Sequence, residues 1–237
     1  MTSASGEDFT QPTTAFWQAI RLAGAGTGPP YRGSYPARLP DGRILDLPVR
    51  RLPGDEPRAV ASLIANQASF AVVDALAGFM ADIARPIAPD VIVGLPTLGF
   101  AFAPLVAEHL GHSNFAPCGY SRKFWYDEEL SEPVESITTP GAGKRLYIDP
   151  NLLPRVTGKR VAIVDDAVSS GQTTVSALRL LTRVGAEPVA VLVAMKQGDR
   201  WRTALANANP SWPDLVHGVF ESPRLRWTDE GWMPDPA

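Results

Sequence analysis

The segment from Val161 to Thr174 restricts the fold of this 237-residue chain more than any other; it reads V-A-I-V-D-D-A-V-S-S-G-Q-T-T. Its first four residues are apolar and mostly β-branched, which is typical of a strand buried on both faces of a parallel sheet. Apolar residues at helical spacing follow over 177–184. The segment therefore predicts a strand, a turn and a helix. Its two acids and its small polar residues then lie at the carboxyl edge of the sheet, where ligands bind in open α/β folds.

The turn offers hydroxyl groups and a row of backbone N–H groups at the start of the predicted helix. Such a loop attracts anions, because the N–H groups are unpaired there and the helix dipole is positive at that end. We therefore expect the loop to bind a phosphate group. The residues concerned are Ser169, Ser170, Gly171, Gln172, Thr173 and Thr174.

Asp165 and Asp166 stand directly before this loop. Two adjacent carboxylates repel each other and lose hydration when they are buried, unless cations or hydroxyl donors meet them. A ribose diol and a hydrated Mg²⁺ would supply both needs. The alternative is that Asp165 only ends the strand and Asp166 caps a turn, with the serines as ordinary cap residues. The coincidence of strand, acid pair, loop and helix in one string favours a ligand site.

The string resembles the phosphoribosyl pyrophosphate (PRPP) signature of type I phosphoribosyltransferases, and the resemblance extends over 90–196. It implies that Asp165 and Asp166 hold the ribose hydroxyls and their Mg²⁺. Ser170 stands where threonine is usual and Gln172 where glycine is common, and both keep polar donors in the loop. The loop residues implied to bind PRPP, its 5′-phosphate in particular, are Ala167, Val168, Ser169, Ser170, Gly171, Gln172 and Thr173.

A second loop, G-L-P-T-L-G-F, follows a predicted buried strand over 90–95 and precedes a predicted helix over 100–110. It closely resembles the adenine phosphoribosyltransferase version of the turn that binds pyrophosphate through backbone amides. Without that resemblance it is a Pro-Gly turn. The residues implied to bind PRPP here are Pro96, Thr97, Leu98 and Gly99.

The charged stretch 121–144 is too long for a simple connection and is predicted to be a flexible lid. Arg122 and Lys123 resemble the Arg-Lys pair from which related enzymes offer positive charge to pyrophosphate, so we assign them with the acid pair as catalytic candidates. Lys144 and Arg145 are placed to close from the far side. Pyrophosphate gains negative charge as its bond to ribose C1 breaks, and nearby cations stabilise that change. As isolated surface cations, these side chains would have no such role.

The alternation of strands and helices predicts an α/β fold, with a parallel twisted sheet flanked by helices and right-handed crossovers. The resemblance adds a small hood from the termini. We expect an N-terminal arm over 1–30 and a single phosphoribosyltransferase-like domain over 31–237. Within it the core spans about 58–196, and the hood comes from 31–57 and 197–237.

Three local patterns carry further expectations. Apolar residues at helical spacing predict a helix over 58–84, the longest in the chain. Pro48 makes the short strand over 44–49 an edge strand at best. The four tryptophans of the C-terminal tail are expected to cover the sheet or pack a dimer rather than stack on a base, with Trp201 as the candidate to reach the base.

Composition limits the partners. A net charge of −3 and a pI near 5.6 give no general attraction to nucleic acid or to anionic membranes. No apolar segment reaches 18 residues and no signal sequence is visible, so we expect a cytoplasmic protein without a membrane or nucleic-acid partner. Cys118 is the only cysteine, which excludes an internal disulfide. The resemblance and the tryptophans predict a homodimer.

The resemblance implies a Mg²⁺-dependent glycosyltransferase that transfers 5-phosphoribosyl from PRPP to a nitrogenous base and releases pyrophosphate. A purine is the expected base, in nucleotide salvage. One alternative is a non-catalytic PRPP-binding regulator that kept the ligand site. Another is a receiver-like phosphoacceptor domain, but its acid pair would come early in the domain, whereas Asp165 and Asp166 come late.

The identity of the base stays open in the sequence. Hypoxanthine-guanine members carry a third acid where this chain has Ser169, and adenine members carry a lid glutamate where it has Pro140. Other lid acids are candidate replacements, with solvation at the surface as the alternative for each. They are Glu128, Glu129, Glu132 and Glu135.

Overall fold

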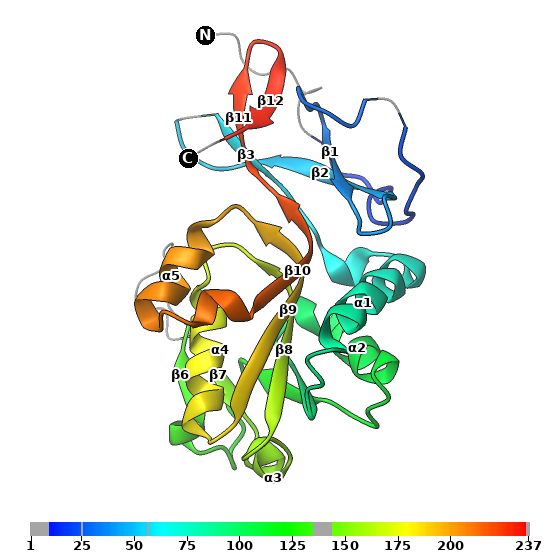
Figure 1. Ribbon diagram of the computed structural model, residues 1–237. Helices are drawn as coiled ribbons and strands as arrows, with labels where there is room; N and C mark the ends of the chain where they lie inside the picture. Colours follow the sequence, from blue (N-terminus) through cyan, green and yellow to red (C-terminus); the bar gives the residue numbers. More distant parts are fainter. Residues whose placement is uncertain (1–9, 25, 56, 135–143, 236–237) are drawn as a thin grey trace.

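The computed structural model describes residues 10–24, 26–55, 57–134 and 144–235. Within them the chain forms two sheets, a large one flanked by helices and a smaller one beyond its end (Figure 1). The large sheet has the strand order β10-β9-β8-β4-β5-β7-β6, and the small sheet has the order β1-β2-β3-β11-β12.

The large sheet is parallel through its first five strands, β10 to β5, and ends in two antiparallel strands, β7 and β6. This confirms the predicted α/β class and the parallel-rich sheet. The strands are β4 (Val91–Gly94), β5 (Ala116–Gly119), β6 (Ser131–Pro133), β7 (Arg145–Ile148), β8 (Arg160–Val168), β9 (Glu187–Gln197) and β10 (Val216–Ser222).

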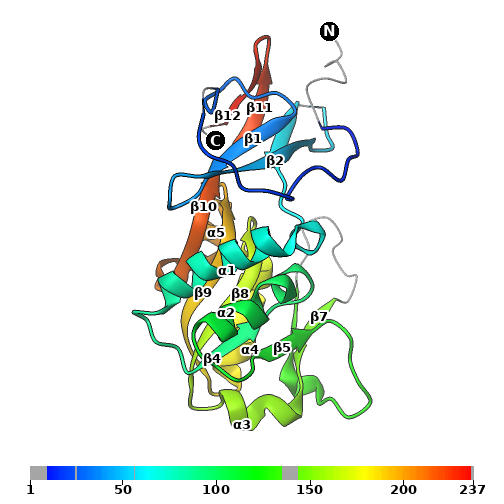
Figure 2. The same cartoon turned by 90° about the vertical axis from the view of Figure 1, so that its right-hand side faces the viewer.

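Helices cover both faces of the large sheet (Figures 1 and 2). On one face lie α1 (Phe70–Ala84) and α2 (Ala103–His109), and on the other α4 (Gln172–Arg183) and α5 (Arg200–Ala208). Shorter helical turns are η1 (Ala65–Gln67), η2 (Leu98–Ala101), η3 (Glu128–Leu130), η4 (Pro150–Leu152), α3 (Leu153–Val156) and η5 (Trp212–Leu215). In the described ranges, every helix is too short or too polar to cross a bilayer.

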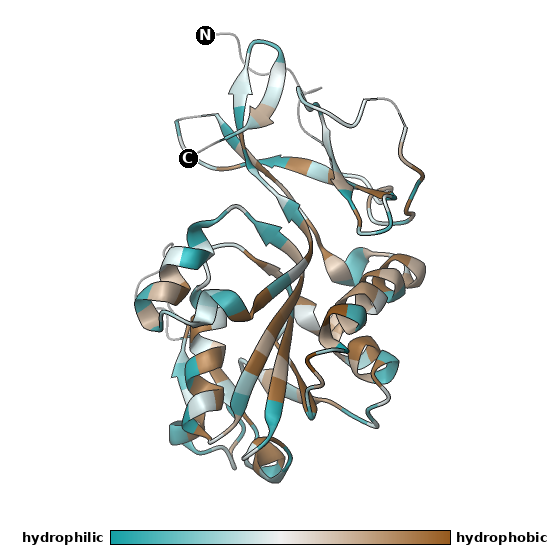
Figure 3. Ribbon diagram, in the orientation of Figure 1, coloured by the Kyte–Doolittle hydropathy of each residue, from teal (hydrophilic) through white to brown (hydrophobic). Residues whose placement is uncertain are grey.

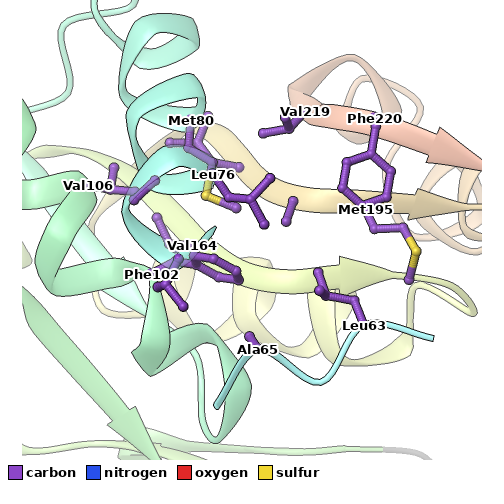
Figure 4. Packing of buried hydrophobic residues seen from close by; sticks show 14 of the residues in the cluster. Leu63, Ala65, Leu76, Met80, Phe102, Val106, Val164, Met195, Val219 and Phe220 are labelled. Atoms are coloured by element: carbon purple, nitrogen blue, oxygen red, sulfur yellow. The ribbon is translucent and has the colours of Figure 1, made fainter. Parts of the chain in front are cut away.

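The apolar run in β8 has no polar face because both faces of the strand are packed against helices. Ala162 and Val164 pack in the cluster that contains α1 and α2, whereas Val161 and Ile163 pack in the cluster that contains α4. Figure 4 shows Val164 among the buried side chains of the first cluster, and Figure 3 shows the central parts of β8 and β9 as hydrophobic. A strand sandwiched between two helical layers must be apolar on both sides.

The small sheet is antiparallel and joins two distant parts of the chain. Its strands are β1 (Ser34–Arg38), β2 (Ile44–Arg51), β3 (Arg58–Ala61), β11 (Arg224–Thr228) and β12 (Gly231–Pro234). The chain passes from β3 of the small sheet into α1, and from β10 of the large sheet into β11. Both connections lie near the carboxyl edge of the large sheet (Figure 1). The domain boundaries given above stay a prediction.

The prediction of one helix over 58–84 is wrong for its first twelve residues, 58–69. Residues 58–61 form β3, and α1 begins only at Phe70, where the Ser69 hydroxyl accepts a hydrogen bond from the Val72 N–H at 3.3 Å. The residues that are 3% exposed or less follow a period of two over this stretch: Ala59, Ala61, Leu63 and Ala65. Period two is the strand pattern, and the two neighbours of β3, β2 and β11, provide the pairing.

Strand β2 is also not an edge strand, because it pairs with β1 on one side and β3 on the other. Pro48 is tolerated because it lies where one ladder gives way to the other. It is opposite Ser34 in the last residue pair with β1, and the pairing with β3 begins only at Val49. The missing N–H of proline therefore interrupts neither ladder.

The tail tryptophans pack against this chain itself. Trp201 is 1% exposed in the α4 cluster, and its indole N–H donates to the Gly198 carbonyl at 3.0 Å. Trp232 is fully buried and contacts Trp227 edge to face. In the N-terminal segment, buried Trp17 belongs to the α1 cluster and donates to the Ser62 carbonyl. Trp201 is thus mainly a core residue, and its exposed edge lines a second cavity that is described below.

Candidate functional site

A cavity of about 360 Å³ lies at the carboxyl ends of β4 and β8. The two loops predicted to bind phosphate groups form most of its wall. Two predicted loop residues, Gly99 and Gln172, do not line it. The lining residues are Pro96, Thr97, Leu98, Tyr120, Lys144, Asp165, Asp166, Ala167, Val168, Ser169, Ser170, Gly171, Thr173 and Thr174.

The acid pair, Asp165 and Asp166, places two carboxyl groups in the wall of this cavity. Asp165 is 9% exposed, and its Oδ1 accepts a hydrogen bond from the Asp166 N–H at 2.9 Å. Burial raises the pKa of Asp165 well above its ordinary value, and the charge of Asp166 adds to this, while Lys144 acts in the opposite direction. Burial also raises the pKa of Asp166. The Lys144 charge and the Asp166 N–H therefore stabilise the Asp165 carboxylate less than burial and the charge of Asp166 destabilise it.

The phosphate loop is supported from behind by α5. Gly171 has φ +82° and precedes the first residue of α4. A Cβ at this position would lie 2.9 Å from Leu205 Cδ1 and 3.0 Å from Trp201 Cα, so both the backbone conformation and the space require glycine. Close packing on α5 fixes the loop, with its backbone N–H groups at the N-terminus of a twelve-residue helix.

The loop after β4 is fixed against the acid pair itself. A Cβ on Gly99 would lie 2.7 Å from the Val164 carbonyl oxygen and 3.0 Å from Asp165 Oδ1. The Leu95 N–H donates to that same Val164 carbonyl at 2.9 Å. The peptide bond between Pro96 and Thr97 is cis. Gly99 does not line the cavity, but its lack of a side chain allows this loop to approach the acid pair closely.

Tyr120 is a site residue that the sequence did not reveal. It follows β5, shares a hydrogen bond with the Thr173 side chain, and has its pKa raised to about 12, mainly by burial. The Lys144 ammonium lies 3.6 Å from the centre of its ring. One signal was available: Tyr120 directly precedes the charged stretch 121–144 that was predicted to be the lid.

The predicted cations divide into two groups. Lys144 lines the cavity, whereas Arg122, Lys123 and Arg145 do not. Arg122 Nη1 lies 3.0 Å from Glu128 Oε1, and Arg145 lies 3.7 Å from the other oxygen of that carboxylate. The catalytic role of Arg122 and Lys123 therefore stays a prediction that requires movement of the lid.

The lid acids show different environments. Glu128 is held by Arg122 and Arg145, and Glu129 is exposed. Glu132 is not solvated as expected, because it is 9% exposed and lies 2.5 Å from Arg183 at the end of α4 remote from the phosphate loop. Glu135 and Pro140 are outside the described residues.

The site fits a magnesium ion only with help from a ligand. Over the described ranges, no group of three or more His, Cys, Asp or Glu side chains is arranged to hold a metal. Asp165 and Asp166 offer carboxylate oxygens, the hard ligands that Mg²⁺ prefers, and Mg²⁺ commonly takes its remaining ligands from water and substrate phosphates. The buried negative charge of the pair suits such a partly hydrated cation.

The comparison with known families agrees with this geometry. The family model described as "Phosphoribosyl transferase domain" matches residues 59–209, which include both cavity loops and the acid pair. The chain belongs to the phosphoribosyl transferase domain family. The stretch 121–144, predicted to be a lid, also lies inside the matched range.

Two kinds of known protein are similar to this chain. The adenine phosphoribosyltransferase of Parafrankia sp. (strain EAN1pec) is 31% identical over 160 residues, covering 65% of this chain and 76% of that protein. The transcriptional regulator GfcR 1 of Methanosarcina barkeri (strain Fusaro / DSM 804) is 35% identical over 112 residues, covering 46% of this chain and 48% of that protein.

A solved structure of the family has the same fold. The adenine phosphoribosyltransferase of Giardia lamblia, in complex with 9-deazaadenine, superposes with a TM-score of 0.57 at 17% identity. The match covers 73% of this chain and 93% of that one. This likeness confirms the predicted fold class, in which helices flank a parallel-rich sheet.

Proposed function

We propose that this protein transfers the 5-phosphoribosyl group of PRPP to a ring nitrogen of a purine base and releases pyrophosphate, with Mg²⁺ as cofactor. The observation that carries the proposal is the cavity in which a buried acid pair and two anion-binding loops meet. The family match and the adenine phosphoribosyltransferase relatives support the reaction type. A ring nitrogen of the base attacks ribose C1 as the bond from C1 to the pyrophosphate oxygen breaks. The electron pair of that bond leaves with pyrophosphate, and the ring N–H proton of the base is released to solvent.

The cavity residues can divide the work among three parts of PRPP. Backbone N–H groups of the loop 169–173 would hold the 5′-phosphate at the start of α4. Asp165 and Asp166 would accept hydrogen bonds from the ribose hydroxyls and would hold Mg²⁺, which would supply positive charge to the leaving pyrophosphate. The loop 96–99 and the Lys144 ammonium would contact the pyrophosphate. Orientation and charge stabilisation then replace a covalent nucleophile.

The acceptor has a second cavity available next to this one. A space of about 490 Å³ lies at the carboxyl ends of β9 and β10, lined on the side of the small sheet by Tyr35 and Arg224 and on the side of the large sheet by Lys196. Lys196 is the strand partner of Val168, which lines the first cavity. Its ammonium lies 2.7 Å from Glu221 Oε1, so a donor and an acceptor stand together. Such a pair can read the polar edge of a purine.

A second candidate function is a regulator that binds PRPP without turnover. The observation favouring it is the similarity to the transcriptional regulator from Methanosarcina barkeri. In addition, Arg122 is paired with Glu128 rather than facing the cavity. A PRPP sensor needs the acid pair and the phosphate loop but not the cations that speed departure of pyrophosphate.

Pyrophosphate release separates the two candidates. The protein is mixed with PRPP and Mg²⁺ and challenged with adenine, hypoxanthine, guanine, uracil and nicotinate in turn, while PRPP binding is followed in the same samples. We expect release that depends on one purine. Tight PRPP binding without pyrophosphate release for any base would favour the regulator over the enzyme. Absence of PRPP binding would refute both candidate functions.

We also propose that the protein is a cytoplasmic homodimer. Two aromatic side chains support a contact between copies, since Phe70 is 94% exposed and Phe124 is 96% exposed. Aromatic side chains are enriched in interfaces between proteins relative to the rest of the surface. Cell fractionation tests the compartment, and recovery in the membrane fraction would contradict it.

A further inference from the structure

The contact between Tyr120 and Lys144 follows from the pairing of their strands. β5 and β7 are antiparallel, with Gly119 opposite Tyr147. Continued by one residue, this register places Tyr120 opposite Leu146 and makes Lys144 its diagonal neighbour on the same face. Diagonal neighbours in an antiparallel pair are within reach when one side chain is aromatic and the other is long.

The geometry of the contact is that of a cation over an aromatic face. The Lys144 nitrogen is 3.6 Å from the ring centre, well inside the range in which the ring attracts a cation. The ring is half-buried and is anchored at its hydroxyl by the Thr173 side chain. A free lysine has four rotatable bonds and loses considerable entropy when it is held in one place, so a fixed platform determines where the ammonium lies.

The position of the Lys144 ammonium matters because the acid pair lines the same cavity. Lys144 and both aspartates line the same cavity, and the charge of Lys144 lowers the pKa of Asp165. The other cations near the lid, Arg122 and Arg145, are held by Glu128 outside the cavity. Among the described residues that line the cavity, Lys144 is the one that carries positive charge.

We propose that Tyr120 is a positioning residue that holds the Lys144 ammonium over its ring, where it meets the pyrophosphate group of bound PRPP. This inference rests on the proposed function. It adds Tyr120, which affects the reaction only by fixing the position of the Lys144 ammonium. Two parts of Tyr120 must then act differently, because the ring face holds the cation while the hydroxyl only anchors the ring.

Three variants separate the ring from the hydroxyl. Tyr120→Phe keeps the ring and loses the hydrogen bond to Thr173, Tyr120→Leu removes the ring, and Lys144→Met removes the charge. We expect Lys144→Met to lower the rate of pyrophosphate release about 100-fold and Tyr120→Leu to lower it about tenfold, while Tyr120→Phe stays within about threefold of wild type. Tyr120→Leu combined with Lys144→Met should be no slower than Lys144→Met alone.

A spectroscopic readout tests the contact without turnover. The Lys144 nitrogen lies 3.6 Å from the Tyr120 ring centre, so the NMR signals of the adjoining ε-methylene protons should be shifted upfield by the ring current. Lys144→Met assigns these signals by their loss. The upfield shift should persist in Tyr120→Phe and disappear in Tyr120→Leu, in protein that remains folded by circular dichroism.

The outcomes are distinct. Equal release by wild type and Tyr120→Leu, or a tenfold loss by Tyr120→Leu that persists in the Lys144→Met background, would overturn the positioning role while leaving the proposed function intact. Loss in Tyr120→Phe as large as in Tyr120→Leu would assign the effect to the hydroxyl and also overturn it. If wild type itself binds no PRPP, the proposed function fails and this inference falls with it.

Discussion

The Ser169 hydroxyl donates a hydrogen bond to Gln197 Oε1 at 3.1 Å, and the Gln197 amide donates to the Ala61 carbonyl at 2.8 Å. Ser169 belongs to the phosphate loop, Gln197 ends β9, and Ala61 ends β3 of the small sheet. One side chain therefore ties the phosphate loop to the sheet that lies over the second cavity.

Replacement of Gln197 by leucine should weaken PRPP binding about fivefold, because the loss of one hydrogen bond costs about 1 kcal/mol and leaves Ser169 unsupported. Isothermal titration with PRPP and Mg²⁺ measures this. The matched test is a cycle with Ser169→Ala. If Gln197 acts through Ser169, the double variant binds as the weaker single variant does, whereas full additivity would show that Gln197 acts elsewhere.

Glycine at 171 should be required for stability as well as for binding. Gly171→Ala adds a left-handed backbone penalty of about 1 kcal/mol and a clash with α5 of about 1–3 kcal/mol, so the free energy of unfolding should fall by about 3 kcal/mol. Gly42→Ala is the control, since Gly42 has φ +84° but nothing within 4 Å of its Cβ. Urea unfolding compares them, and equal losses would disprove the packing argument.

The acid pair should make the ligand-free protein less stable as pH rises. The folded-state pKa of Asp165 is raised above the ordinary value of 3.8, so the folded protein holds its proton more tightly than the unfolded chain. Its stabilising contribution is complete below pH 3.8 and is lost as pH rises through the folded-state pKa. In Asp165→Asn this part of the slope should vanish. A denaturant midpoint with the same pH dependence in both proteins would contradict the assignment.

The homodimer should be visible at micromolar concentration by sedimentation equilibrium, and Phe124→Ser should weaken it because that ring is 96% exposed in the single chain. Leu22→Ser is a suitable control, since Leu22 is an exposed apolar residue at 80% in a different segment. A wild-type protein that sediments as a monomer would contradict the proposed dimer.

The sequence was sufficient for elements whose residues are contiguous. β8, the phosphate loop and α4 were predicted together because the apolar strand, the small polar turn and the helix follow one another over 161–183. The strand over 58–61 was missed because its partners, β2 and β11, include residues more than 160 positions away. Small apolar residues such as Ala59 and Ala61 fit helical and strand spacing alike.

The same limit applied to the candidate site. Both cavity loops were predicted because each follows its own strand, but Tyr120 was not, since its contact with Lys144 depends on the register between β5 and β7. Arg122 and Arg145 carry the expected charges but face Glu128, and no local pattern indicates which of several lid cations enters the cavity. Lys144 does so because of the strand pair, which sequence spacing alone does not specify.

Calorimetric titration of the protein with PRPP in the presence of Mg²⁺ tests the central claim most directly, when wild type is compared with Asp165→Asn combined with Asp166→Asn. The control is Asp229→Asn with Glu230→Gln, which removes the same charge from exposed residues of the turn between β11 and β12. We predict Mg²⁺-dependent binding to wild type and control, and loss of that binding in the first double variant while it stays folded. Unchanged affinity in that folded double variant would contradict the account.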